Sequence, residues 1–575
     1  MAIHNATIAS IFEEIADLLD IQGANPFRVR AYRNASRTIG ELGTDVKTLL
    51  ERGTALTDIP GIGEDLARKI DEILRTGKCD FLERLRKEVP PAITELLKIP
   101  GLGPKRVKAL WHDLNIQTLE QLMRAAKDGR IRALPGFGDK TEQHILEAAQ
   151  AHLSQARRFK LAVAAQYAEA FAGYLRRVKG VEEVVIAGSF RRMRETVGDI
   201  DILVAAEEGS GVMDRFTAYE EVRDVLASGP TRGSVVLKSG IQVDVRVIPR
   251  QSWGAALVYF TGSKAHNIAI RRIAQDKGLK LNEYGVFKGD KPVAGADEIS
   301  VYKSIGLPWI PPELREDRGE VEAAQAGKLP KLVDLADLQG DLHVHSKASD
   351  GHNTIREMAQ AAQAAGLQYI AMTEHSRRLT VAHGLDPARL AKQGAEIDRL
   401  NRELEGITVL KGIEVDILED GTLDLPDSAL ASLDIVVAAV HSKFDLPRVK
   451  QTQRILMALD NPAVSILAHP TGRLIEERDP YDVDMQRIIR KAKARNVALE
   501  VNAHPERLDL LDIHCQMAKQ EGVLVSINSD AHSTYEFGML GYGVGQARRG
   551  WLEKRDVLNT KSLKDLRRWL SERRS

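Results

Sequence analysis

Two acidic residues one position apart mark the first place where this sequence could carry out chemistry. Asp199 and Asp201 open an apolar run, and alternate residues of a strand point to the same face. The two carboxylates are therefore predicted to project together, where each raises the pKa of the other unless a cation neutralises them. Asp244 alternates with apolar residues in a second predicted strand. Three carboxylates on adjacent strands can hold two Mg²⁺ ions together with a triphosphate.

A Gly-Ser turn lies upstream of the acidic pair, at Gly188-Ser189, and Arg192 follows it. A hydroxyl and a guanidinium on such a turn could bind the β- and γ-phosphates of a nucleotide. The alternative is an acidic strand end that faces solvent, because Asp-x-Asp alone is a common pattern. The upstream turn and the downstream Asp244 favour a phosphate-transfer site.

Histidines concentrate late in the chain, where ten of the fifteen follow residue 340. Six of them, with three acidic residues, stand at or near the ends of predicted strands: His343, His345, Asp350, His375, Glu414, His441, His469, Asp530 and His532. Side chains at the carboxyl ends of barrel strands converge on one mouth. Nine ligands are enough for two or three metal ions, and mixed nitrogen and oxygen donors without cysteine favour Zn²⁺, Mn²⁺ or Fe²⁺.

A Pro-Gly-x-Gly loop occurs three times, at residues 59–63, 99–103 and 134–138, each time before a predicted helix. Proline fixes φ and glycine tolerates positive φ, so the chain can turn tightly into a helix whose N–H groups hold a DNA phosphate. The alternative, a tight helix–helix turn without DNA, is less favoured for three copies than for one. The predicted DNA-binding residues are Gly61, Gly63, Gly101, Gly103, Lys105, Gly136 and Gly138.

The elements that must position these residues differ along the chain. Residues 1–150 have helical periodicity throughout, residues 155–316 mix helices and strands, and residues 285–305 resemble short strands. The remainder alternates strands with helices, which predicts a parallel sheet or a βα barrel. The strands expected there are 342–344, 369–372, 409–413, 435–440, 464–467, 498–501 and 524–527.

Composition excludes several classes of protein. A chain of 575 residues is expected to form roughly four domains. Only Cys79 and Cys515 are present, which excludes a disulfide framework and fits a reducing, cytoplasmic location. There is no secretory signal and no apolar run that could span a membrane. The 81 basic and 81 acidic residues balance, so contacts with nucleic acid must be local.

The acidic segment resembles a known signature. Gly188-Ser189 followed by Gly198-Asp199-x-Asp201 is similar to the nucleotidyltransferase signature of family X DNA polymerases, such as DNA polymerase beta. Residues 259–263, Tyr-Phe-Thr-Gly-Ser, resemble the nucleotide-binding segment of that family. The resemblance implies that Asp199 and Asp201 ligate both metals, and that Asp244 ligates the catalytic metal near the primer 3′-hydroxyl. The nucleotide-binding residues it implies are Ser189, Arg192, Gly198, Tyr259, Phe260, Gly262, Asn267 and Arg271.

Within this resemblance, Tyr259 and Phe260 screen the sugar 2′ position and Asn267 contacts the base. Val197 departs from the family, which often has serine there. The repeated loops resemble the helix-hairpin-helix motif, and Lys69 matches the position of the family's lyase lysine. Asp65 stands where the family often has a phosphate-binding lysine. A solvated helix lysine therefore stays an alternative for Lys69.

The histidine-rich part resembles the PHP domain, named for polymerase and histidinol phosphatase. That family has a distorted (βα)₇ barrel with a trinuclear metal site that hydrolyses phosphoesters, and in bacterial polymerases it typically supplies a 3′→5′ exonuclease that is often Mn²⁺-dependent. All nine ligand positions of the family are filled. The resemblance therefore implies an active barrel with two or three Zn²⁺ or Mn²⁺ ions, whereas Mg²⁺ is expected at the first site.

Together these resemblances imply a multidomain protein of the α+β and α/β classes. The expected domains are a helical DNA-binding domain (1–85), helix-hairpin-helix fingers (86–150), a palm (151–250), a thumb (251–316), a linker (317–338) and a PHP barrel (339–575). The implied function is a DNA polymerase that fills short gaps in repair, including base excision repair, with an exonuclease or 3′-end phosphoesterase. The expected partners are gapped or primed DNA and dNTPs, and the expected state is a monomer without membrane contact.

Two alternatives stay open. A nucleotidyltransferase that acts on RNA would fit the acids, although the Tyr259-Phe260 pair argues against it. A DNA-binding protein with an inactive polymerase core and a phosphatase for small phosphate esters would fit the barrel, although the complete Asp set argues against it.

Overall fold

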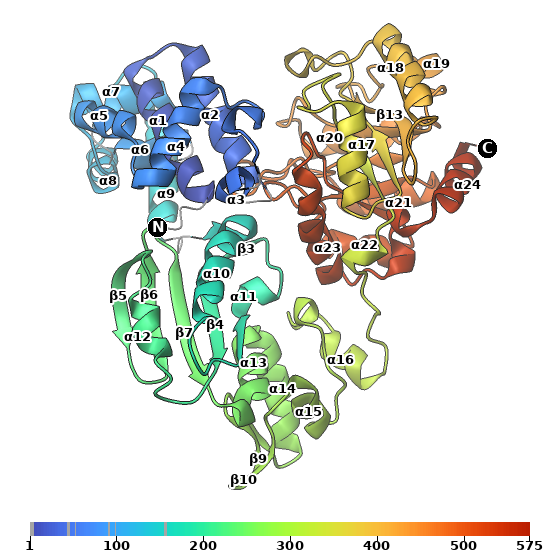
Figure 1. Cartoon of the computed structure of the whole chain (residues 1–575). Helices are drawn as coiled ribbons and strands as arrows, with labels where there is room; N and C mark the ends of the chain where they lie inside the picture. Colours follow the sequence, from blue (N-terminus) through green and yellow to red (C-terminus); the bar gives the residue numbers. More distant parts are fainter. Residues whose placement is uncertain are drawn as a thin grey trace. The chain divides into compact units, whose positions relative to one another are not determined.

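The computed structural model describes residues 5–42, 46–51, 53–89, 93–97, 99, 101–154 and 158–574. The chain divides into two compact units, Met1–Phe159 and Lys160–Ser575 (Figure 1). Pro100, in the second predicted loop, lies outside the described residues. Within the described ranges, no helix combines the length and apolar composition that crossing a membrane requires.

The first unit is helical, as the sequence predicts. Glycine sets the limits of α4: Gly63 stands at its N-cap, and Gly77 ends it in the left-handed conformation. The face of α4 formed by Leu66, Ile70 and Ile73 is buried. The helices are α1 (Asn5–Gln22), α2 (Pro26–Glu41), α3 (Val46–Glu51), α4 (Glu64–Thr76), α5 (Asp80–Glu88), α6 (Thr94–Leu97), α7 (Pro104–Leu114), α8 (Leu119–Lys127) and α9 (Asp139–Ser154).

The palm is a five-stranded sheet in the order β2-β4-β7-β6-β5. Its central strands β4 and β7 are parallel, and β6 and β7 form an antiparallel hairpin. Helix α10 packs on β2 and β4, whereas α12 packs on β5 and β6 (Figure 1). The bounds are β1 (Phe159–Lys160), α10 (Leu161–Leu175), β2 (Glu183–Ile186), α11 (Gly188–Arg191), β3 (Thr196–Val197), β4 (Asp199–Ala205), α12 (Val212–Thr217), β5 (Val222–Ser228), β6 (Arg232–Leu237) and β7 (Gln242–Ile248).

The thumb corrects one expectation from the sequence. Residues 285–305 contain two short strands, but Glu298–Ser304 form a helix instead of a strand. The signal is Asp297, whose side chain accepts a hydrogen bond from the Ser300 N–H as an N-cap. The elements here are α13 (Trp253–Thr261), α14 (Lys264–Asp276), β8 (Lys280–Asn282), β9 (Gly285–Lys288), β10 (Lys291–Ala294), α15 (Glu298–Ser304) and α16 (Glu320–Gln325).

The segment expected as a linker, residues 317–338, is packed against the thumb. Val321, Ala324 and Leu332 join the thumb core. Glu320 is fully buried and its Oε1 lies 2.7 Å from Nδ1 of His266. The segment therefore holds the thumb and the barrel together as one compact unit rather than spacing them apart.

The barrel confirms the predicted fold class. Seven parallel strands follow one another in sequence order, and a bridge from Val344 to Ala531 nearly closes the sheet. Every predicted strand is present. The strands are β11 (Gly340–Val344), β12 (Tyr369–Met372), β13 (Thr408–Asp416), β14 (Ile435–Ala439), β15 (Ile466–Leu467), β16 (Ala498–Asn502) and β17 (Val525–Asn528).

Helices surround this barrel, and apolar side chains fill its interior. Trp569 and Leu570 of the last helix pack against inward-facing residues such as Leu342 and Tyr369. The barrel is therefore a packed core with its chemistry at one end. The helices are α17 (Ile355–Ala364), α18 (Pro387–Leu400), α19 (Asp427–Leu430), α20 (Arg448–Ala458), α21 (Met485–Ala494), α22 (Asp512–Glu521), α23 (Leu540–Arg549) and α24 (Leu563–Arg574).

Candidate active sites

The three palm carboxylates lie together, as the spacing predicts. Asp201 on β4 is directly opposite Asp244 on β7, and Asp199 precedes Asp201 on the same face. Ile200 and Ile202 point the other way and are fully buried. Burial and then the charges of Asp199 and Asp244 raise the pKa of Asp201 to about 7. A bound cation would relieve this repulsion, so the donor set fits Mg²⁺.

Glycine is required at position 188 beside these acids. Gly188 adopts a φ of 60°, and a Cβ there would lie 2.1 Å from Oδ2 of Asp201. The absence of a side chain lets the turn that carries Ser189, in α11, approach the carboxylates. Gln242 also acts on the site, because its amide donates hydrogen bonds to both carboxylate oxygens of Asp244 at 3.3 and 3.0 Å. Sequence reasoning did not predict this role for Gln242, although it stands two residues before Asp244 and therefore on the same face of the strand.

The predicted phosphate-binding arginine is held by the thumb in this structure. Arg192 donates through Nη1 to the carbonyl of Thr261, and its Nε lies 3.1 Å from Oε1 of Glu316. Its side chain is 13 % exposed, and burial lowers its pKa despite Glu316. Gly262 stands beside Arg192, since a Cβ on Gly262 would lie 3.2 Å from Nη1. Triphosphate binding would therefore compete with an existing ion pair.

The predicted nucleotide segment begins at the end of α13. Tyr259 and Phe260 are partly exposed, with ring centroids 5.0 Å apart. The Asn267 amide donates to the Tyr259 carbonyl at 2.7 Å, which ties α14 to this pair. Arg246, on the same face of β7 as Asp244, stacks over the Phe260 ring at 4.4 Å. Arg271 is exposed farther along α14, and Gly198 immediately precedes β4.

In the barrel, Glu414 is the centre of the histidine cluster. Its Oε1 lies 2.9 Å from Nε2 of His469 and 3.1 Å from Nε2 of His441, and its Oε2 lies 2.6 Å from Nδ1 of His375. His343 and His345 also approach it, at 3.5 and 3.7 Å. Five imidazoles from four strand ends therefore converge on one carboxylate that is 1 % exposed.

The cluster contains three groups whose ligand atoms could each hold an ion. The groups are His345, Asp350, His375 and His532; His343, His345 and Asp530; and His375, Glu414 and His441. Within the described residues, several buried ring nitrogens there make no hydrogen bond, including both nitrogens of His345 and Nε2 of His343. Buried polar atoms without partners are costly, and a metal ion would satisfy them. The donor set therefore fits transition metals.

The charges in the cluster favour ionised carboxylates. Burial alone would raise the pKa of Glu414, but His441, His375 and His343 hold it well below its usual value. Likewise, burial is outweighed for Asp530, whose pKa is well below its usual value because of His343, His345 and His532. Burial, with His532 and His375 nearby, lowers the pKa of His345 to about 3, so this ring is neutral and able to ligate.

A second layer of carboxylates fixes these imidazoles, and sequence reasoning missed it. Oε1 of Glu500, on β16, lies 2.7 Å from Nδ1 of His343, and Oδ1 of Asp416 lies 2.6 Å from Nδ1 of His441. Each contact fixes the ring so that the other nitrogen faces the cluster. The sequence contained a signal, because Glu500 is an acid within an apolar strand, the same pattern that singled out Asp244. In the structure Glu500 is fully buried.

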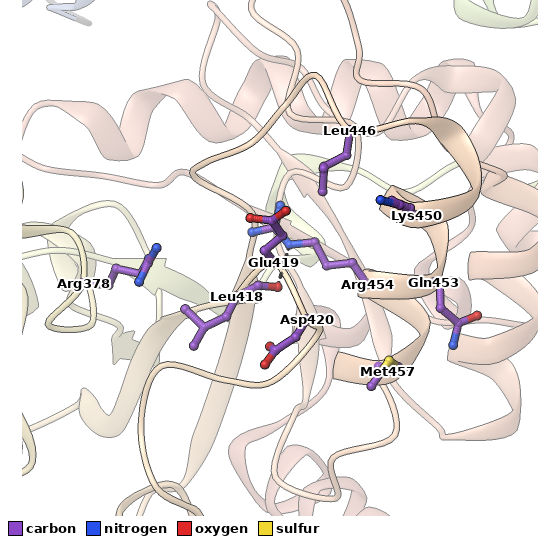
Figure 2. Close-up of a pocket in the computed structure, with 9 residues that line it drawn as sticks. All are labelled: Arg378, Leu418, Glu419, Asp420, Leu446, Lys450, Gln453, Arg454 and Met457. Atoms are coloured by element: carbon purple, nitrogen blue, oxygen red, sulfur yellow. Dashed lines mark hydrogen bonds between the residues drawn. The ribbon is translucent and has the colours of Figure 1, made fainter.

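A pocket of about 570 Å³ lies on the barrel outside the predicted ligand set (Figure 2). Its lining comes from the segments after β12, β13 and β14 and from α20: Arg378, Leu418, Glu419, Asp420, Leu446, Lys450, Gln453, Arg454 and Met457. The guanidinium of Arg454 donates hydrogen bonds to the backbone carbonyls of residues 417, 418 and 442, so it is not free to bind a ligand in the pocket. The remaining charges balance, with Arg378 and Lys450 against Glu419 and Asp420, so they leave no charge excess that would select a phosphate.

The repeated loops have the local geometry that the sequence predicts. Gly61, Gly101 and Gly136 adopt positive φ, and Gly63 and Gly103 stand at the N-caps of α4 and α7. All six loop glycines, including Gly138, and Lys105 are exposed. Arg106 joins two of the loops, donating to the carbonyls of Gly101 and Gly136.

Lys69 is not a solvated helix lysine, because its side chain is only 14 % exposed. Its Nζ lies 2.6 Å from Oδ2 of Asp65 and over the ring of Phe81 at 5.4 Å. The acid at position 65 therefore pairs with the lysine directly.

Comparison with protein families covers most of the chain. Residues 3–79 match the helix-hairpin-helix domain, and residues 93–151 match the SAM-like helix-hairpin-helix tandem. Residues 162–240 match the DNA polymerase beta palm, and residues 256–316 match the DNA polymerase beta thumb. Residues 341–504 match the PHP domain.

Individual relatives agree with these matches. The chain is 40 % identical to the DNA polymerase/3′-5′ exonuclease PolX of Bacillus subtilis (strain 168) over 571 residues, which cover 99 % of each chain. It is 32 % identical to a probable phosphatase of Thermoanaerobacter sp. (strain X514) over 38 % of this chain and 89 % of the relative. It is 27 % identical to DNA polymerase lambda of Rattus norvegicus over 54 % of this chain and 56 % of the relative.

Proposed function

The chain belongs to the family X DNA polymerases that carry a C-terminal PHP domain, and from this premise we propose that it fills short gaps in DNA during repair. We propose further that its barrel removes nucleotides or phosphates from 3′ ends, as a 3′→5′ exonuclease. The observation that carries the proposal is that one chain holds two clusters, the three acids on β4 and β7 and the nine predicted ligands centred on Glu414, which is one of them.

In the proposed synthesis, the primer 3′-oxygen attacks the α-phosphorus of a dNTP and pyrophosphate leaves. Asp199, Asp201 and Asp244 would hold two Mg²⁺ ions, and the barrel ligands would hold two or three Zn²⁺ or Mn²⁺ ions. When bound, such ions neutralise charge on phosphoryl oxygens and make water more acidic. The protein's own part is positioning, which supplies most of the catalysis in phosphoryl transfer.

Individual residues would divide that positioning between them. Ser189 and Arg192 would hold the triphosphate, Tyr259 and Phe260 would exclude a 2′-hydroxyl, and the loop glycines before α4, α7 and α9 would hold the DNA backbone without reading sequence. Gapped DNA and dNTPs are the proposed partners. We propose a monomer in the cytoplasm.

The test uses the full-length protein on a duplex with a 5′-phosphorylated one-nucleotide gap. With Mg²⁺ and dNTPs the primer should gain one nucleotide, and with Mn²⁺ alone it should shorten from its 3′ end. The double variant Asp199→Ala, Asp201→Ala should lose extension and keep shortening, and His343→Ala should do the reverse. If either change removed both activities, or no dNTP were added by the wild type, the proposal would be wrong.

The match to probable phosphatases supports one competing function, a barrel that hydrolyses small phosphate esters. Histidinol phosphate offered beside the gapped duplex discriminates the two. Rapid ester hydrolysis without loss of DNA 3′ nucleotides would favour the phosphatase. Incorporation of ribonucleotides as readily as deoxyribonucleotides would contradict the proposed role of Tyr259 and Phe260.

A further inference from the structure

A group of charged side chains joins the palm and thumb to the barrel and includes the predicted phosphate-binding residue of the palm. We call it the boundary cluster, and it consists of Arg192, Glu316, Arg318, Asp512 and Arg549. Arg192 lies in the palm, Glu316 is the last residue of the thumb and Arg318 follows it. Asp512 and Arg549 lie on α22 and α23 of the barrel. All these residues lie within one compact unit.

Arg549 is the best buried member of the boundary cluster, with a side chain 3 % exposed. Its Nη1 donates to the carbonyl of Arg192 at 2.9 Å and to Oε1 of Glu316 at 2.8 Å. Its Nη2 donates to Oδ2 of Asp512 at 2.6 Å. A side chain of the barrel therefore contacts the backbone of the predicted triphosphate-binding residue and also the carboxylate that pairs with it.

One carboxylate oxygen of Glu316 is shared between two arginines, and Nη1 of Arg194 lies 3.9 Å from the other oxygen. The same atom, Oε1, accepts from Nε of Arg192 at 3.1 Å and from Nη1 of Arg549 at 2.8 Å. Glu316 is 11 % exposed, so little water screens these interactions. Because both arginines donate to the same oxygen, each of them weakens the hydrogen bond that Glu316 makes with the other. Without Arg549, Oε1 of Glu316 would accept from Arg192 alone and bind it more tightly.

The anchor of Arg549 is rigid. Helix α23 packs against β16 and β17, which form part of the barrel wall. Arg318 also reaches Oδ2 of Asp512, at 3.0 Å, so Asp512 is fixed from two sides. The position of the guanidinium of Arg549 is therefore set by the barrel and not by the palm that it contacts.

We propose that Arg549 is a positioning residue of the polymerase site, through which the barrel keeps Arg192 available for the incoming triphosphate. Arg549 does so by drawing Glu316 away from Arg192 and by holding the Arg192 carbonyl. This inference rests on the proposed function, because it takes Arg192 as a ligand of the dNTP. Arg549 itself contacts no substrate.

The test is steady-state gap filling by the full-length protein carrying Arg549→Met, with the dNTP concentration varied. We expect the KM for dNTP to rise about tenfold, the middle of the usual range for coupled sites, with kcat changed less than about threefold. The matched control is Arg548→Met. Arg548 is adjacent on α23, and its guanidinium donates to Glu313, Asp334 and the Val333 carbonyl rather than to Arg192 or Glu316. An equal rise in KM for Arg548→Met would overturn the proposal, because it would show general loosening of the boundary.

Two further variants test the route through Glu316. In a Glu316→Gln background the competing carboxylate is gone, so adding Arg549→Met should change KM by less than about threefold. Arg549→Lys keeps a cation without the fork of donors, so its KM should lie between those of the wild type and Arg549→Met. If the effects of Glu316→Gln and Arg549→Met on the KM for dNTP were additive, Arg549 would not act through Glu316. The lysine variant also keeps the test decisive if Arg549→Met fails to fold.

The failure of this inference is distinguishable from failure of the proposed function. If the wild type adds no nucleotide, or if Arg192→Met leaves the KM for dNTP unchanged, the proposed role of the palm fails. If Arg192→Met raises KM while Arg549→Met does not, only the inference about Arg549 is wrong.

Discussion

The palm and the barrel both place acidic side chains beside apolar strands, yet they hold them in different ways. In the palm, Asp199, Asp201 and Asp244 are partly exposed and repel one another. In the barrel, Glu414 is almost completely buried and faces five imidazoles, two of which are fixed by further carboxylates. The palm therefore suits ions that arrive with each nucleotide, and the barrel suits ions that stay bound between turnovers.

The largest effect is expected when one central acid is removed from each site. Asp244→Asn should lower nucleotide addition by about a thousandfold or more and leave hydrolysis unchanged, and Glu414→Gln should do the opposite. Primer extension and 3′-end shortening on the same gapped duplex measure both effects. Loss of both activities in either variant would mean that the two clusters form one functional site.

The next largest effect is expected at Gly188, where the turn that carries Ser189 approaches the palm acids. Gly188→Ala should lower gap filling by about a hundredfold, because its Cβ would displace Asp201, while hydrolysis stays unchanged. Gly209→Ala is the matched control, since Gly209 also has positive φ, +81°, but has no atom within 4 Å of the added Cβ. Equal loss in the two variants would assign the effect to backbone strain alone.

A smaller effect is expected at the barrel site from the carboxylates that orient its histidine ligands. Glu500→Gln should weaken metal binding by about 10- to 100-fold, because His343 loses the partner that orients it. Metal content after dialysis against graded chelator measures this. Glu521→Gln is the control, because Glu521 pairs with Arg490 on the surface. Unchanged metal retention in Glu500→Gln would show that the carboxylates behind the imidazoles do not help the barrel to retain its ions.

The smallest effect on either activity is expected from a buried ion pair outside both sites. Burial opposes ionisation of Glu298, but Arg315 and Arg191 lower its pKa from 4.5 to about 2. Since the folded-state pKa lies below the unfolded one, the pair stabilises the fold above pH 4.5. The contribution, about 3 kcal/mol, is lost as pH falls toward 2.

Glu298→Gln should accordingly lower the unfolding free energy at pH 7 and flatten its dependence on pH between 4.5 and 2. Chemical denaturation over that pH range is the measurement. At 25 °C and pH 7 both activities should remain near those of the wild type. A selective loss of gap filling would show that Glu298 belongs to the palm site and not only to its support.

Much of the fold and of the two sites could be predicted because strand periodicity and metal ligation are local patterns. The strands of the barrel lie where short apolar runs indicated them, and their ends carry the expected ligands. Strand β5 was missed because most of its residues face solvent and no apolar alternation marks it. Helix α15 was missed because a short apolar segment can form either structure, and only the capping by Asp297 favours the helix.

The sequence by itself determined which residue types could bind metal and on which strand ends they stand. Only the tertiary structure decided their partners: Glu500 meets His343 across 157 positions, and Arg549 meets Arg192 across 357. The physical reason is that periodicity governs neighbours along one element, whereas a buried charge must find its partner among whatever residues the packing of distant elements brings within hydrogen-bonding distance.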